Sequence, residues 1–347
     1  MVRYTAELGA VAPLFAGLRG FAGVSATQDD YFANSTPAGV SQHGFVDRVF
    51  GGNKTIDDHG LPFRKKSYAD GAAFGELAWD SAVVNVVAGA RFEHHSRSGA
   101  AFTPRLALTH AWERAHVKLL ATRAFRPPSI GNLDYNNSLK PEYTTVLEAE
   151  AGYRISDKAF IAANVFDITL EKPIVFTIAV NGTSNYYNFS HSGSRGAELT
   201  AQTSFGRATT NASVSFYSAS GKNRVVDYAV PGHADLALGA PHVKATLATS
   251  VNFGGGLSAG VTGVWLGERF SIEGYDAGGA PITVRDEPIL LANAQIAWRH
   301  IANRYDVALG GYNLLGSRFA WIEPYAGGHP QIPSEPREFT LRVSAAF

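Results

Sequence analysis

Hydrophobic and polar residues alternate with a period of two along most of the chain. In residues 143–153 the odd positions are mostly apolar and the even positions mostly polar. A strand with one apolar face produces this pattern, whereas a helix would send Glu148 and Glu150 to different faces. The pattern therefore predicts strands. It recurs at 197–205, 208–216, 243–253 and 339–347, with weaker copies at 83–95, 102–112, 117–125, 257–270 and 290–299.

Short and long connections alternate along the middle and the end of the chain. The short ones have the length of tight hairpin turns and lie at 156–158, 206–207, 254–256 and 302–304. The long ones lie at 29–66, 127–141, 179–186, 221–240, 271–285 and 314–336. A meander with its short turns at one rim and its long loops at the other gives this order, and transmembrane β-barrels are built in this way.

The predicted strands reach the length of about 9–11 residues that a tilted membrane strand needs. The polar faces suit a wet barrel interior, and the apolar faces suit lipid. We therefore expect an all-β fold with almost no helix, an antiparallel transmembrane β-barrel of about 15 strands. A soluble β-sandwich or propeller is the alternative. Six residues should point toward lipid in one continuous band: Ala149, Leu199, Val214, Leu247, Leu290 (or Leu291, which spacing favours less) and Leu341.

Composition supports this fold and excludes several functions. Hydrophobic residues make up 45% of the 347 positions and charged residues only 17%, with a net charge of zero. Neutrality argues against a nucleic-acid partner. The absence of cysteine excludes disulfides, zinc-thiolate sites and a cysteine nucleophile. The most apolar stretch, 8–24, is interrupted by Pro13 and Arg19, so we identify no convincing export signal.

Five motifs resemble the C-terminal part of TonB-dependent outer-membrane receptors. Each stands at a predicted strand end, and they occur in the family's order. They are RAFRPPSIGNL at 123–133, LKPE at 139–142, GAEL at 196–199, NLLGSRF at 313–319 and PREFTLRVSAAF at 336–347. Leu315 and Gly316 depart from the family pattern, which has Phe and Asp there. The resemblance spans most of residues 68–347.

The resemblance implies a barrel of about 22 strands that encloses an N-terminal plug domain. We find neither a plug nor the short box that binds the energy-transducing TonB complex. Residues 1–347 are expected to form a single barrel region, with a first strand at about 2–11 and a last strand at 337–347. The chain thus looks like the last two-thirds of a receptor barrel, an incomplete larger barrel. We expect it to be unable to transport actively by itself, unless a plug and box are supplied elsewhere.

The function implied is uptake of a scarce ligand across the bacterial cell outer membrane, most simply a ferric siderophore or similar metal chelate. We expect its binding residues at the long-loop rim: Arg126, Asn132, Asp134, Tyr135, Tyr186, Tyr187 and His233. Tyrosine and arginine there offer stacking, hydrogen bonds and charge. By resemblance, Phe347 ends a strand that the barrel assembly machinery reads. Outer-membrane lipid is the remaining partner, and we expect no cofactor.

Two other functional classes are open at this stage. A passive porin-like channel, or a truncated receptor remnant without active transport, fits the missing plug and box. A barrel enzyme needs a nucleophile and a base that we cannot identify, and no Gly-x-Ser-x-Gly motif is present, so we expect no enzyme activity. We also expect no metal site, because the adjacent His94 and His95 would point to opposite faces of a strand.

Overall fold

The computed structural model describes residues 2–33, 64–178, 184–276, 281–322 and 332–346. Its main element is one antiparallel sheet of 15 strands. In sheet order, which is also chain order, these are β1 (Val2–Phe15), β2 (Leu18–Ala33), β3 (Arg64–Trp79), β4 (Asn85–His95), β5 (Gly99–Ala111), β6 (Ala115–Arg126), β7 (Glu142–Ser156), β8 (Ala159–Glu171), β11 (His191–Phe205), β12 (Ala208–Ser218), β15 (Val243–Gly254), β16 (Leu257–Leu266), β19 (Ile289–Ile301), β20 (Tyr305–Tyr312) and β23 (Glu338–Ala345).

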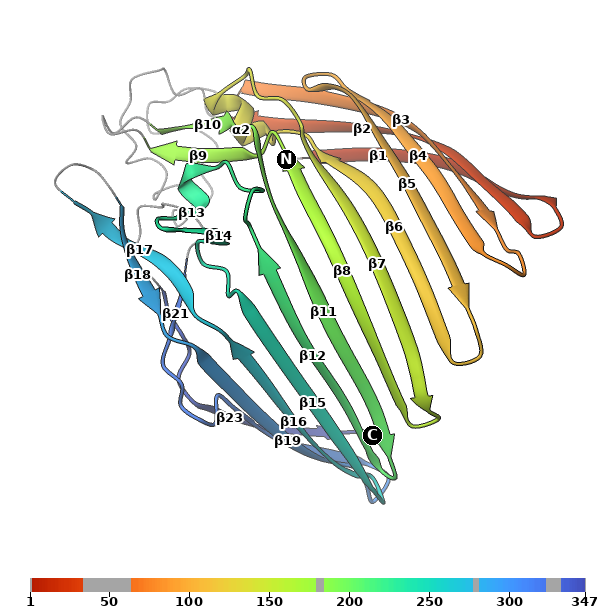
Figure 1. Ribbon diagram of the computed structural model, residues 1–347, viewed down its shortest axis with the longest axis vertical. Helices are drawn as coiled ribbons and strands as arrows, with labels where there is room; N and C mark the ends of the chain where they lie inside the picture. The colour runs from red at the N-terminus through yellow and green to blue at the C-terminus, as the bar shows by residue number, and fades with distance from the viewer. Residues whose placement is uncertain (1, 34–63, 179–183, 277–280, 323–331, 347) are drawn as a thin grey trace.

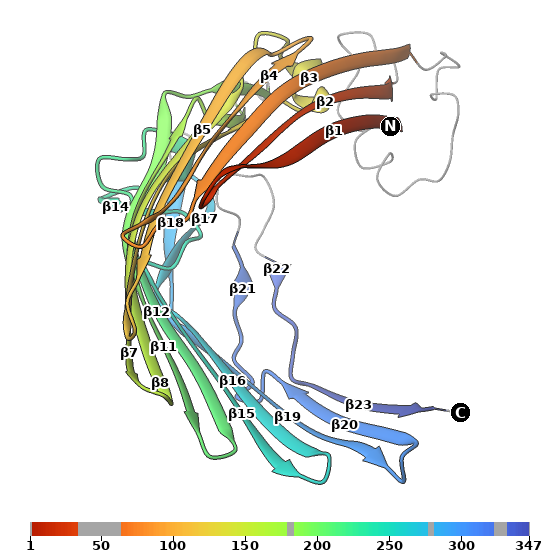
Figure 2. The same ribbon diagram turned by 90° about the vertical axis from the view of Figure 1, so that its right-hand side faces the viewer.

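The sheet bends into an open crescent, with β1 at one edge and β23 at the other (Figure 2). Helix is confined, in the described residues, to α2 (Ile130–Tyr135) and the single 3₁₀ turn η1 (Val226–Tyr228). No helix in this part of the chain is long and apolar enough to cross a bilayer. The all-β prediction is therefore confirmed, and so is the strand number of about 15.

The strand register puts the apolar positions of the spanning strands on one face. Directly opposed residues of an antiparallel pair point to the same side of the sheet. Leu199 lies opposite Val214, and Leu341 lies opposite Leu309. Following the pairing from strand to strand places all six predicted residues on this face, with Leu290 rather than Leu291 among them. Leu199, Leu247 and Leu341 keep 50%, 47% and 69% of their surface exposed, so no second sheet packs over them.

The opposite face of the sheet carries polar and charged side chains joined in pairs. Arg3 binds Asp29 through two hydrogen bonds of 2.6 and 2.7 Å, and Arg91 lies 2.7 Å from Glu93. This face also holds phenylalanine rings over glycines, and Phe166 over Gly196 is one of these pairs. Side chains here are more covered than those on the apolar face, as expected on the concave side of a curved sheet.

The short turns gather at one rim and most of the long connections at the other (Figure 1). Two differences from the sequence prediction concern the bounds of strands. The first strand continues to Phe15, beyond residue 11, because Pro13 sits on an edge strand where its missing N–H is tolerated. The region 271–285 lies mostly in a hairpin, β17 (Arg269–Tyr275) with β18 (Pro281–Asp286), not a plain loop. The connection at 96–98 is short although it lies at the long-loop rim.

Candidate ligand-binding rim

The connection between β6 and β7 contains α2, and its own side chains explain why it is helical. Ser129 is the N-cap residue, and its Oγ accepts a hydrogen bond from Asn132 N at 3.1 Å. In return, Asn132 Oδ1 accepts one from Ser129 N at 3.0 Å, which completes a capping box. This reciprocal pair fixes the start of a helix only six residues long, which would not be stable in isolation.

The next long connection along the chain forms a hairpin of β9 (Ile174–Ile178) and β10 (Ser184–Asn188). Several hydrogen bonds fasten it to the α2 connection and to the first residue of β7. Asn136 Nδ2 donates to the carbonyl of Tyr186 at 2.8 Å. Asn188 Oδ1 accepts from Lys140 N at 2.8 Å. Glu142 Oε2 accepts from Ile174 N at 3.1 Å.

Three aromatic rings meet where α2 and the hairpin touch, and we call Tyr135, Phe176 and Tyr186 the aromatic rim cluster. The ring centroids of Tyr135 and Tyr186 are 5.7 Å apart, and those of Phe176 and Tyr186 are 5.0 Å apart. Tyr135 lies edge-on to Phe176 at 6.3 Å. These edge-to-face arrangements leave Tyr135 54% exposed, so its ring is available to a ligand.

The aromatic rim cluster lies on the concave side of the sheet. Tyr68 projects from the polar face of β3 and forms one buried cluster with Leu133, Leu139 and Ile174, against which Tyr186 packs. Strand β3 is not adjacent to β6, β7 or β8 in the sheet. The α2 connection and the hairpin must therefore bend across the concave face to reach Tyr68, and Figure 1 shows α2 beside the start of β3 at the upper rim.

The Arg126 side chain lies at the base of this assembly, on the last residue of β6. Its Nε is 2.6 Å from Oε1 of Glu142, the carboxylate that also binds the hairpin. Glu142 is only 8% exposed, whereas the Arg126 side chain is 67% exposed. Burial of a carboxylate is costly unless it is paired, and Arg126 supplies the pair while keeping part of its guanidinium accessible.

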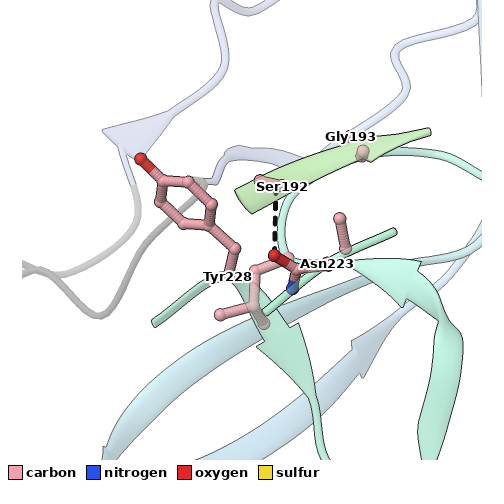
Figure 3. A pocket seen from close by; sticks show the side chains of 7 residues that line it. Ser192, Gly193, Asn223 and Tyr228 are labelled. Carbon is pink, nitrogen blue, oxygen red and sulfur yellow. Dashed lines mark hydrogen bonds between the residues drawn. The ribbon is translucent and has the colours of Figure 1, made fainter. Parts of the chain in front are cut away.

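A second group of rim elements lies between β12 and β19. It comprises η1, β13 (Ala229–Val230), β14 (His233–Ala237) and the β17–β18 hairpin. Val230, Leu236 and Leu238 form its buried core, with Phe270 and Ile272 packed against them. This group borders a small pocket of about 210 Å³, lined by Ser192, Gly193, Asn223, Tyr228, Ala237, Leu238 and Ala240 (Figure 3).

Two charged groups of this second assembly are perturbed by burial. Burial raises the pKa of the Asp227 carboxyl, in η1, above its usual range. Burial lowers the pKa of the Arg269 guanidinium, and the opposing charge of Asp286 limits that fall. Both shifts come from charge held away from water at the rim. Ser271 Oγ donates to Asp286 at 2.8 Å, so this carboxylate is part of a small polar network.

The seven residues predicted to bind ligand separate into two places. Arg126, Asn132, Tyr135, Tyr186 and Tyr187 lie in the assembly around α2, whereas His233 lies on β14, with its ring 4.9 Å from Phe270. Asn132 completes the capping box of α2 with Ser129. Tyr187 faces away from Tyr186 on its strand and is 49% exposed. The side chain of Asp134 and the whole of Phe347 lie outside the described residues.

Sequence reasoning missed Phe176, which completes the aromatic rim cluster. The signal was present, because Phe176 stands in the mostly apolar run 174–180, which an Asn181-Gly182 pair separates from Tyr186. An Asn-Gly pair between such segments is a strong indication of a hairpin. Among the described residues no group of His, Asp and Glu is arranged to hold a metal ion.

A family model for the TonB-dependent receptor-like β-barrel matches residues 3–314 of the chain. The chain belongs to the TonB-dependent receptor β-barrel family. Members of this family are outer-membrane proteins and are transporters rather than enzymes. The 15-stranded sheet of this chain is therefore part of a transmembrane β-barrel wall.

Solved structures of siderophore receptors share this fold. The siderophore receptor PirA from Acinetobacter baumannii is 15% identical to this chain with a TM-score of 0.76. The match covers 99% of this chain and 54% of the PirA chain. A ferric enterobactin receptor (PfeA) variant from Pseudomonas aeruginosa, in complex with enterobactin, is 18% identical with a TM-score of 0.77 and the same coverage. The FrpB iron transporter from Neisseria meningitidis is 14% identical to this chain with a TM-score of 0.72. The match covers 98% of this chain and 54% of the FrpB chain.

The chain thus spans about half the length of these structures. At these identities the likeness establishes the fold alone. A search of curated protein sequences gave no match.

Proposed function

We propose that the chain forms part of an outer-membrane receptor that takes up a ferric siderophore or a similar metal chelate. The observation that carries this proposal is the aromatic rim cluster bent across the concave face. A ligand that enters the barrel from the long-loop rim would pass Tyr135 and the accessible side of Arg126. Aromatic rings and a guanidinium suit a chelate that carries flat aromatic groups and negative charge.

The same proposal assigns the partners. The apolar face contacts outer-membrane lipid, and the barrel assembly machinery inserts the strands. Energy coupling to the TonB complex requires a plug and a box, which the proposal places outside residues 1–347. Cells that carry these residues alone are therefore expected to bind the chelate without accumulating it.

The test is binding of ⁵⁵Fe-labelled enterobactin to Gram-negative cells that lack their own siderophore receptors and express the chain with an added export signal. Ferric citrate, which has no aromatic groups, is the comparison ligand. We expect saturable binding of ferric enterobactin, and a loss of about tenfold in Tyr135→Ala, since a stacking contact of roughly 1–1.5 kcal/mol corresponds to that factor. Tyr153→Ala, an exposed tyrosine of β7 near the short-turn rim, is the matched control.

Each result has a defined meaning once surface exposure of the barrel has been verified by protease accessibility. Inserted protein that binds no more ferric enterobactin than cells with empty vector would contradict the receptor proposal. Non-saturable entry of small sugars without chelate binding would identify a passive channel instead. Accumulation of iron that stops when the proton-motive force is collapsed would show that these residues contain the coupling element.

A further inference from the structure

The apolar face of the sheet carries charged side chains toward the long-loop ends of β6, β8 and β11. In β8 the residues on this face are apolar up to Val165 and polar from Asp167 onward. Asp167 lies directly opposite Leu147 of β7 and Arg195 of β11, and opposed residues point to the same side of a sheet. Arg123 of β6 shares this face. These charges therefore lie beside the apolar band and not on the polar face.

Five charged side chains gather at these positions, and we call them the outer charged cluster: Arg123, Asp167, Glu171, Arg195 and Lys222. Arg123 Nη2 donates a hydrogen bond to Oε2 of Glu171 at 2.8 Å. The same guanidinium lies over the ring of Tyr143, 4.5 Å from its centroid. Both contacts hold Arg123 in place at the end of β6.

Lys222 comes from the connection that follows β12 and reaches across β11 to β8. Its Nζ donates to Oδ1 of Asp167 and, at 2.9 Å, to Oγ1 of Thr169. Its side chain is only 15% exposed, whereas that of Arg195 is 58% exposed. Arg195 Nε lies 4.0 Å from the second oxygen of Asp167, too far for a hydrogen bond. Arg195 therefore keeps an accessible guanidinium.

The outer charged cluster combines excess positive charge with an adjacent apolar surface. Three cations face two carboxylates within it. Leu147, Val165 and Leu199 lie next to it, toward the short-turn rim, and are 51%, 54% and 50% exposed. A charge on the lipid side of a barrel is costly at the bilayer midplane but tolerated near the interface, where headgroups lie. A molecule with both a phosphate and acyl chains matches this surface.

We propose that the outer charged cluster binds the phosphate of a membrane-lipid headgroup. Arg195 offers a fork of N–H donors that fits phosphate oxygens, and Arg123 and Lys222 add positive charge at fixed positions. The acyl chains of the same lipid lie along Leu147 and Val165. The proposal rests on the membrane placement of the sheet within the proposed function, and is independent of which chelate binds at the rim.

The test measures lipid binding to the 347-residue chain. The protein is extracted in detergent from the outer membranes of cells that express it with an added export signal, so that only inserted protein is used. Native mass spectrometry then follows binding of dioleoylphosphatidic acid, with dioleoylphosphatidylcholine and inorganic phosphate as comparison ligands. We expect phosphatidic acid to bind about tenfold more tightly than phosphatidylcholine, because only its headgroup carries net negative charge. Inorganic phosphate should not displace it, since free phosphate has no acyl chains.

Two variants should change this affinity in opposite directions. Arg195→Gln removes the accessible guanidinium and should weaken binding of phosphatidic acid about tenfold. Asp167→Asn removes a competing carboxylate and should strengthen it severalfold. Arg105→Gln is the matched control, because the Arg105 side chain is 57% exposed but lies on the polar face of the sheet.

Equal affinity for phosphatidic acid in Arg195→Gln and Arg105→Gln would overturn the proposal. Equal binding of the two lipids would do the same. Displacement by inorganic phosphate would assign the cluster to a free anion and overturn the lipid assignment. Protein that binds phosphatidic acid as expected but no ferric enterobactin would contradict the receptor proposal and leave this inference standing.

Discussion

The Nε atom of Arg126 lies 2.6 Å from Oε1 of Glu142, and the other oxygen of the same carboxylate accepts a hydrogen bond from Ile174 N. One buried carboxylate thus joins the ends of β6 and β7 to the first residue of the β9–β10 hairpin. The hairpin carries two of the three rings of the aromatic rim cluster. The position of the rings over the concave face therefore depends on Glu142.

Replacing Glu142 with Gln should loosen the hairpin. A hydrogen bond to a charged acceptor contributes roughly 1.5–3 kcal/mol, and a neutral amide acceptor gives up about half of this. We expect the amide of Ile174 to exchange hydrogen about tenfold faster in Glu142→Gln, as measured by hydrogen exchange with mass spectrometry. Glu148→Gln, on the same strand and the same face, is the control and should leave this exchange unchanged. If the Ile174 amide exchanges at the same rate in both variants, Glu142 does not hold the hairpin in place.

Gly196 should not tolerate even a methyl group. A Cβ there would collide with the carbonyl oxygen of Phe216 and lie 2.5 Å from the ring of Phe166. Such overpacking costs about 1–3 kcal/mol where the neighbour is backbone that cannot move aside. We expect Gly196→Ala to lower the urea midpoint of unfolding in detergent or vesicles. Gly263→Ala is the control, because nothing lies within 4 Å of a Cβ at that glycine. A Gly196→Ala barrel as stable as the Gly263→Ala barrel would show that the strands adjust.

The two faces of β11 should respond oppositely to a charge. Leu199 lies near the middle of the strand on the apolar face, and Thr200 lies on the polar face. Arginine toward lipid costs roughly 2–4 kcal/mol at the bilayer midplane, while a position facing the lumen is hydrated. We expect Leu199→Arg to reduce the fraction inserted into vesicles severalfold and Thr200→Arg to leave it near the original level. A larger defect in Thr200→Arg would reverse the assignment of the faces.

The sequence could predict the strands and their faces because alternation is a local property. Each of the six residues expected on the apolar face has an apolar neighbour two positions away in its own strand, and cross-strand pairing follows once the turns are short. The choice between Leu290 and Leu291 shows the limit of spacing. The strand register distinguishes the two residues, because Leu290 lies opposite Trp265 on the apolar face.

The rim could not be predicted to the same extent, because it depends on contacts between distant segments. Tyr68 and Ile174 share a buried cluster although 106 positions separate them, and nothing local in either segment indicates this. Asn132 is a different case, because its side chain bonds to Ser129 only three positions away and completes the capping box of α2. His233 lies at the same rim but on β14, in the second rim assembly.

The second rim assembly should depend on pH through Asp227. Burial raises the pKa of this carboxyl in the folded protein above its ordinary value of 3.8. The folded state therefore binds the proton more tightly than the unfolded state, and stability falls as pH rises from 3.8 to the raised value, then stays constant. We expect Asp227→Asn to slow hydrogen exchange in residues 226–230 at pH 7 but not at pH 3.5. Asp235→Asn, an exposed carboxylate on β14, is the control. Equal protection in Asp227→Asn and the unaltered chain at pH 7 would contradict this account.

The last prediction concerns Phe347, which we propose as the residue read by the barrel assembly machinery. In β23 the residues at 339, 341, 343 and 345 share the apolar side of the sheet. As an ordinary interface aromatic, its deletion would remove apolar burial of about 1–3 kcal/mol and leave insertion nearly normal. As a recognition element, its deletion should cause periplasmic accumulation and degradation out of proportion to that energy. The experiment moves residues 336–347 onto a complete receptor of the same family and compares inserted with total protein after deletion of Phe347. Phe339→Ala in the same strand is the control, because it removes a 67% exposed lipid-facing ring without altering the chain end. If the two variants lose the same inserted fraction, Phe347 acts only as an interface residue.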